Sequence, residues 1–111
     1  MNIGERIALL QEELKFEDER QEVLYTEFWM LRDLCPNDLD KMISSDERKE
    51  LIALNKARER GESEALARWP EFLTWKSAEE TESNLSASLC DLRRTNRIVE
   101  RIIEILKKAM R

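Results

Sequence analysis

The sequence contains no histidine, the side chain most often used for acid–base catalysis near neutral pH and the commonest nitrogen ligand of metal ions. Histidine-dependent catalytic triads and histidine zinc or di-iron sites are therefore excluded. Only two glycines and two prolines occur among 111 residues, too few for a protein built from many short strands and turns. These absences predict a helical, non-enzymatic chain without a cofactor.

Cysteine is also scarce, and Cys35 and Cys90 lie too far apart in sequence to form a CxxC-type cluster. We expect both to be small buried thiols in a reducing compartment. The N-terminus lacks the basic and then apolar segments of a signal peptide, and no apolar run approaches the roughly 18 residues that span a bilayer. These features predict a soluble cytoplasmic protein that does not insert into membranes.

Charged residues make up 39% of the chain, well above the roughly 25% of an ordinary globular domain. Residues 1–50 carry seven Lys or Arg and fourteen Asp or Glu, whereas residues 93–111 carry seven and two. We expect an acidic first helix to lie antiparallel to, or near, a basic last helix. The net charge of −5 and the absence of aromatic residues after Trp75 disfavour nucleic-acid binding.

Acidic residues cluster between positions 12 and 22, and helical bundles can hold metal ions between facing carboxylates. Glu79, Glu80 and Glu82 suggest half of the magnesium motif of helical pyrophosphohydrolases, but the second acidic pair at Glu-x-x-Asp spacing is missing. A solvated acidic face explains these residues, so we expect no metal site. Four arginines that could bind a dicarboxylate are more simply exposed helix residues: Arg6, Arg20, Arg48 and Arg58.

Apolar residues recur at alternating spacings of four and three over residues 3–14, the spacing of a packed helical seam. The same register then reaches Glu17 and Gln21, so the seam becomes polar in its middle. Either the apolar stripe steps sideways onto Phe16 and Val23, or a polar layer receives a partner.

Turn and cap signals set the remaining helix boundaries. Pro36 ends the first helix, Ser44 and Glu47 have capping-box spacing, and Gly61 is a natural left-handed terminator. Pro70 can occupy the first turn of the next helix. The predicted helices span residues 3–34, 38–60 with a break near 45, 63–69 and 71–110.

From residue 71 to 110 no glycine or proline occurs, and the seam is apolar except at Glu82 and Asn96. A lone Asn in such a seam fixes register or partner number. A second apolar row beside the seam makes the arc too wide for one hairpin partner, so two helices of the same bundle or an external partner must cover it. The candidate partner-binding residues are Asn96, Ile98, Val99, Ile102, Ile103, Ile105, Leu106 and Met110.

The sequence also leaves open whether its three tryptophans lie in the core of the bundle or at a partner interface. Trp29 lies in a helical turn that is apolar on all sides, and Trp69 and Trp75 bracket Pro70. These side chains either close an end of the bundle or anchor a partner. The fold prediction is a single all-α domain over residues 1–111, an elongated antiparallel bundle of three main helices with coiled-coil-like packing.

The chain resembles the FlgN-type flagellar export chaperones and related type III secretion chaperones. The resemblance rests on the long first helix, the segment Glu50–Leu54 followed by Ala57 and Arg58, Trp69, and Asn96–Glu100 followed by Ile103 and Leu106. It implies a cytosolic, non-enzymatic chaperone whose last helix receives an amphipathic terminal helix of a hook-filament junction or other secreted subunit. The alternative is a structural or regulatory helical homo-oligomer that uses the same C-terminal stripe on itself, so the chain is either a monomer or a homodimer.

Overall fold

The computed structural model describes residues 1–35, 39–68 and 77–110, which contain three long α-helices and a 3₁₀ turn, η1 (Leu39–Lys41), and no strand. The long helices are α1 (Ile3–Leu34), α2 (Ser45–Arg68) and α3 (Ala78–Ala109). They form a rod of 53 × 21 × 20 Å. The structure confirms the predicted elongated all-α bundle.

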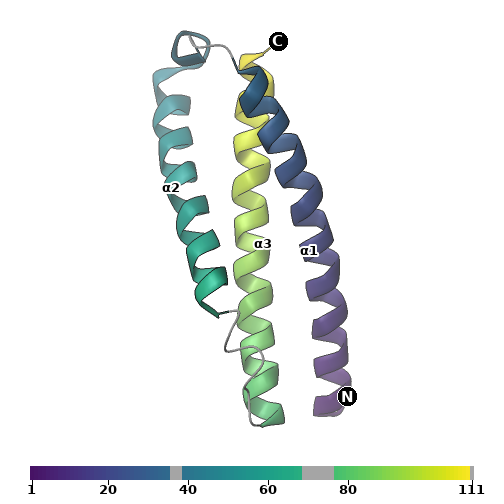
Figure 1. The fold of residues 1–111 in the computed structure, drawn as a ribbon. Helices are drawn as coiled ribbons and strands as arrows, with labels where there is room; N and C mark the ends of the chain where they lie inside the picture. The colour runs from purple at the N-terminus through teal and green to yellow at the C-terminus, as the bar shows by residue number, and fades with distance from the viewer. Residues whose placement is uncertain (36–38, 69–76, 111) are drawn as a thin grey trace.

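Helix α3 lies between the other two helices (Figure 1). The chain runs up α1, down α2 and up α3, so α1 and α3 are parallel neighbours and α2 is antiparallel to both. The acidic first helix therefore lies near the basic last one, as expected, but the antiparallel arrangement of these two helices is wrong. The two are parallel because a single long helix separates them in the sequence and reverses the chain between them.

The helix starts follow the capping rules. Asn2 accepts a hydrogen bond from the amide of Glu5 at 2.9 Å at the start of α1, and Ser77 accepts one from the amide of Glu80 at 3.1 Å at the start of α3. Before α2, the amide of Glu47 donates to Ser44 Oγ at 3.1 Å and the amide of Ser44 donates to Glu47 Oε1 at 3.3 Å. The predicted capping box and the break near residue 45 are confirmed.

Helix α2 continues through Gly61 to Arg68, so the predicted termination at Gly61 and the separate helix over residues 63–69 are wrong. Gly61 has no positive φ. A Cβ atom at this position would lie 2.6 Å from Thr95 Oγ1 on α3, closer than atoms can pack. Glycine is needed here because α2 and α3 approach closely, a requirement that local turn chemistry does not reveal.

The main hydrophobic cluster combines Phe28 of α1 with a face of α3, and half-buried Leu51 and Leu54 of α2 pack against it. Leu85 and Leu89 extend the buried face of α3 toward its N-terminal end. Helix α3 begins at Ala78, after Ser77 in an extended conformation, so the predicted continuous helix over residues 71–110 is wrong at its start. Residues 71–76 and the roles predicted for Pro36, Trp69, Pro70 and Trp75 fall outside the described residues. Because α3 packs against both other helices, it supplies most of the core.

Candidate functional site

The structure buries most of the residues predicted to bind a partner. Val99, Ile102 and Asn96 are fully buried, and Ile103, Ile105 and Leu106 are at most 5% exposed. Ile98 is half-buried, and Met110 at the end of α3 is 37% exposed. Of the two interpretations of the wide apolar arc, the structure therefore shows the first, in which two helices of the same bundle cover it.

The polar middle of the first seam is an internal layer between α1 and α3. Asn96 Nδ2 donates to the backbone oxygen of Glu17 at 3.1 Å and to Glu17 Oε2 at 3.0 Å. The Glu17 carboxylate is 9% exposed and lies 3.4 Å from Arg20 and 3.7 Å from Arg93. Neither sequence-based interpretation of this layer was right, because its partner is α3 itself and Phe16 remains exposed.

A ladder of ion pairs runs beside this layer at a constant offset between the parallel helices. Glu13 lies 3.6 Å from Arg93, Arg20 pairs with Glu100, and Glu27 lies 2.5 Å from Lys107. The members recur every seven residues on both helices, and their signs alternate. A slip of one heptad in either direction would bring like charges together, so the ladder selects the register of α1 on α3.

A second polar cluster joins α1 to α2 and corrects the expectation that Arg58 is exposed. Arg58 is only 4% exposed; its guanidinium lies 5.0 Å from the ring centre of Phe28 and 2.9 Å from Glu62. Tyr25 donates a hydrogen bond to the same carboxylate at 2.5 Å. Burial, and then this hydrogen bond, raise the pKa of Tyr25. On α2, the positions of Leu51, Leu54, Arg58 and Gly61 follow one another at spacings of three and four. The burial of Arg58 could have been predicted from this periodicity.

The other three candidate arginines do not form an anion site with Arg58. Arg6 pairs with Glu82 at 3.1 Å near the start of the bundle, Arg20 belongs to the ladder, and Arg48 is exposed near the start of α2. Because the four arginines lie at different levels of the rod, the structure gives no support to a dicarboxylate site.

Helix α2 also pairs with α3 through carboxylates near its N-terminal end. Glu50 accepts two hydrogen bonds from Arg101, at 2.6 and 3.1 Å, and Glu47 accepts one from Lys108 at 3.3 Å. The Arg101 hydrogen bonds lower the pKa of Glu50, and those to Ser44 lower the pKa of Glu47. These contacts hold the N-terminal half of α2 against α3.

The expectation that both cysteines are buried is only partly confirmed. Cys35 is half-buried and desolvation raises its pKa, whereas Cys90 is exposed on α3. Both are free thiols. For Trp29, the sequence left open whether the side chain lies in the core or at an interface. It is 48% exposed, and its ring packs edge-to-face against the ring of Phe28. The guanidinium of Arg32 lies 5.2 Å from the centre of the Trp29 ring.

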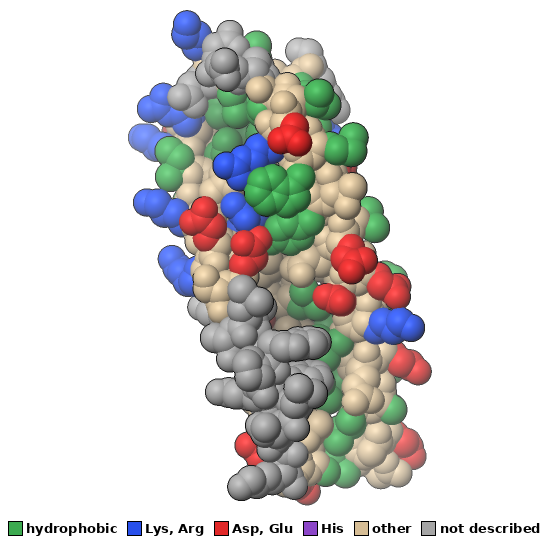
Figure 2. All heavy atoms as spheres, viewed as in Figure 1, with side chains coloured by type: hydrophobic (Ala, Val, Ile, Leu, Met, Phe, Trp, Pro, Cys, Tyr) green, Lys and Arg blue, Asp and Glu red, His purple; other side chains and the backbone are tan. Residues whose placement is uncertain are grey.

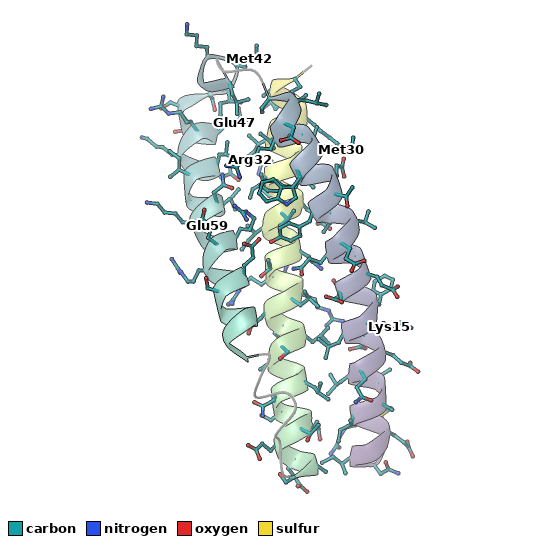
Figure 3. All side chains as sticks on the ribbon, viewed as in Figure 1. Lys15, Met30, Arg32, Met42, Glu47 and Glu59 are labelled. Atoms are coloured by element: carbon teal, nitrogen blue, oxygen red, sulfur yellow. The ribbon has the colours of Figure 1, made fainter. Side chains whose placement is uncertain are left out.

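The candidate site is a row of apolar side chains on the outside of α1, which we call the outer row. Leu9, Phe16, Val23 and Met30 recur every seven residues and are 43, 66, 68 and 59% exposed. Hydrophobic side chains at intervals along the outer edge of α1 are visible in Figure 2, and the labelled Met30 projects away from the rod in Figure 3. The sequence indicated Phe16 and Val23 only as a sideways continuation of the inner seam. Their seven-residue spacing with Leu9 and Met30 is the signal that identifies the row.

The immediate surroundings of the outer row are charged. On one side, three and four residues away along the helix, lie Glu13, Arg20 and Glu27 of the ladder. On the other side lie the exposed acids Glu12, Glu19 and Asp33. The outer row therefore separates charges that are paired with α3 from carboxylates that face water.

Within the described residues, no group of three or more Cys, Asp or Glu side chains is arranged to hold a metal ion. No helix in this part of the chain is long and apolar enough to cross a membrane. No family model matches the sequence, and neither the curated proteins nor the solved structures give a match to it.

Proposed function

We propose that this protein is a non-enzymatic binding protein that holds an amphipathic helix of another protein against the outer row of α1. The observation that carries the proposal is the exposure of four large apolar side chains at heptad spacing on a bundle whose other long seams are packed. A helix laid along α1 could contact every member of such a row.

The finer form of the proposal is an export chaperone in the cytoplasm that holds a terminal helix of a flagellar hook-filament junction or other type III secreted subunit. The resemblance of the sequence to FlgN-type chaperones supports this form. The α3 stripe could receive a client only after α1 or α2 had left it, whereas the outer row is accessible in the folded protein. We therefore place the client on α1.

The test uses a fluorescent helical peptide with leucines at heptad spacing and glutamines at the flanking positions. Fluorescence anisotropy gives its Kd for the wild type, for Phe16→Ser/Val23→Ser and for Ile52→Ser. Ile52 on α2 is 52% exposed and outside the row, so it is the matched control. We expect the double variant to weaken binding at least about tenfold and the control to leave it unchanged. Equal binding by all three proteins would contradict the proposal.

The competing arrangement is a homo-oligomer. Light scattering coupled to size exclusion over a wide concentration range distinguishes it, because a self-associating protein gains mass with concentration without any peptide. A protein that stays monomeric at all concentrations supports the proposal that the outer row is free to bind another protein.

A further inference from the structure

The outer row has neighbours that restrict what can bind to it. Glu12 lies one turn from both Leu9 and Phe16, and Glu19 lies one turn from both Phe16 and Val23. Within the described part of the chain, neither of these exposed glutamates forms an ion pair. A helix seated on the row would bring its own flanking side chains next to these carboxylates.

A second copy of the chain is a poor occupant on grounds of charge. In an antiparallel two-fold pair, the same flank of each helix faces its copy, so Glu12, Glu19 and Asp33 would lie opposite the same acids. In a parallel pair this acidic flank would face Glu13, Arg20 and Glu27, whose side chains already pair with α3. Lys15, one turn from both Glu12 and Glu19, is the exposed cation on this side of α1, and in either arrangement the acids of the flank outnumber it.

The exposed area also disfavours a stable dimer. Four side chains of this size, about half exposed, present on the order of 400 Å² of apolar surface. An obligate homodimer interface buries about 1,000 Å² or more on each partner, of which roughly 65% is apolar. The outer row alone is therefore too small for a permanent dimer, but is large enough for a reversible helix contact that charge pairs reinforce.

We infer that the occupant of the outer row is a basic amphipathic helix of another protein, with apolar residues at heptad spacing and Lys or Arg beside them. This inference rests on the proposed function, since it specifies the partner of the same surface. The unpaired acids select the partner by charge, while the apolar row supplies the contact area. Salt therefore weakens the preference for a basic partner and leaves the apolar contact in place.

The experiment compares two peptides that share the leucine row and differ only in their flanks, which are lysine in one and glutamate in the other. Their Kd values are measured by anisotropy at low and at high salt. We expect the lysine peptide to bind at least about tenfold more tightly at low salt, with most of the difference lost at about 0.5 M salt.

Two charge-reversal variants complete the design. Glu12→Lys/Glu19→Lys should reverse the preference toward the glutamate peptide. Asp18→Lys/Glu22→Lys is the matched control, because it makes the same change in net charge on exposed residues of α1 further from the outer row. This control should keep the lysine preference, and circular dichroism verifies that both variants are folded.

The possible outcomes distinguish the basic-partner inference from the proposed function. Equal binding of both peptides that still depends on Phe16 and Val23 would overturn the basic-partner inference while leaving the proposed function standing. Binding of neither peptide, or binding insensitive to the row, would overturn the proposed function as well. Concentration-dependent dimerisation that Phe16→Ser/Val23→Ser abolishes would show that a second copy is the occupant and would overturn the inference.

Discussion

The inner face of α3 and the outer row of α1 both carry large apolar side chains, yet they lie in opposite environments. Ile102 is fully buried and Phe16 is 66% exposed. The inner face is covered because α3 is the central helix, with α1 on one side and α2 on the other. The outer row is exposed because α1 has only one full-length neighbour. The position of a helix in the bundle, and not its spacing of apolar residues, decides which row is core.

The largest expected effect is the difference in stability between a substitution on the inner face of α3 and one in the outer row of α1. Ile102→Ala should lower the free energy of unfolding by about 2–5 kcal/mol, because it leaves a cavity in the packed centre. Phe16→Ala should change it by no more than about 0.5 kcal/mol, since its side chain is mostly in water. Urea denaturation followed by circular dichroism measures both values. Equal destabilisation by the two variants would refute the assignment of core and surface.

The next effect concerns the polar layer inside the α1–α3 seam. Asn96→Leu should destabilise the protein by about 1–3 kcal/mol, because the buried Glu17 carboxylate loses a hydrogen-bond donor. Adding Glu17→Leu should recover much of this loss by removing the buried charge. A double-mutant cycle by urea denaturation checks the coupling. Additive effects of the two substitutions would mean that the layer does not act as a unit.

A smaller effect tests the contact between α2 and α3. Gly61→Ala should destabilise by about 1–2 kcal/mol, since the strain of overpacking against Thr95 exceeds the gain of roughly 1 kcal/mol in helix propensity. In a Thr95→Ala background the same change should cost less. Gly4→Ala is the control, because a Cβ there would lie 3.4 Å from the nearest atom. Thermal melts that show Gly61→Ala to be stabilising would contradict this close approach.

The smallest expected effect is the pH dependence of stability that arises from Glu47 and Glu50 in the N-terminal half of α2. Because the pKa values of Glu47 and Glu50 are lowered in the folded protein, their contribution is present above the ordinary glutamate pKa of about 4.3. It is lost as the pH falls through the lowered folded values. Glu50→Gln should therefore be less stable than wild type at pH 7, and the difference should shrink as the pH falls below about 4.3. Glu12→Gln, which removes an unpaired carboxylate, should show no such convergence in urea midpoints measured over the same pH range.

Much of the fold could be predicted from local patterns. The first helix has the predicted bounds, the Ser44 capping box forms, and the last helix carries the predicted seam. Two of the errors involve neighbours that are distant in the sequence. The local sequence predicts a helix terminator at Gly61, because Thr95, whose proximity explains the glycine, lies 34 positions away. The partner of Arg58 on α1, Phe28, is similarly remote.

The candidate site was harder to predict than the fold. The wide apolar arc of α3 indicated a surface in need of cover, but the sequence did not show that α1 and α2 both reach it. The outer row contributes only one apolar residue per heptad between charged neighbours, so it is weaker as a pattern than the packed seam. Only the placement of α1 at the edge of the rod shows that this row faces water.

The most direct test of core and surface is thiol labelling at one position of each row. Single cysteines at Phe16→Cys and Ile102→Cys are placed in a background with Cys35→Ala and Cys90→Ser, and labelling rates are measured under native conditions. We expect position 102 to react at least about 100-fold more slowly, because opening the core costs several kcal/mol, and the lysine-flanked peptide to protect position 16 alone. Comparable rates at both positions would contradict the claim that the α3 face is core and the α1 row is the binding surface.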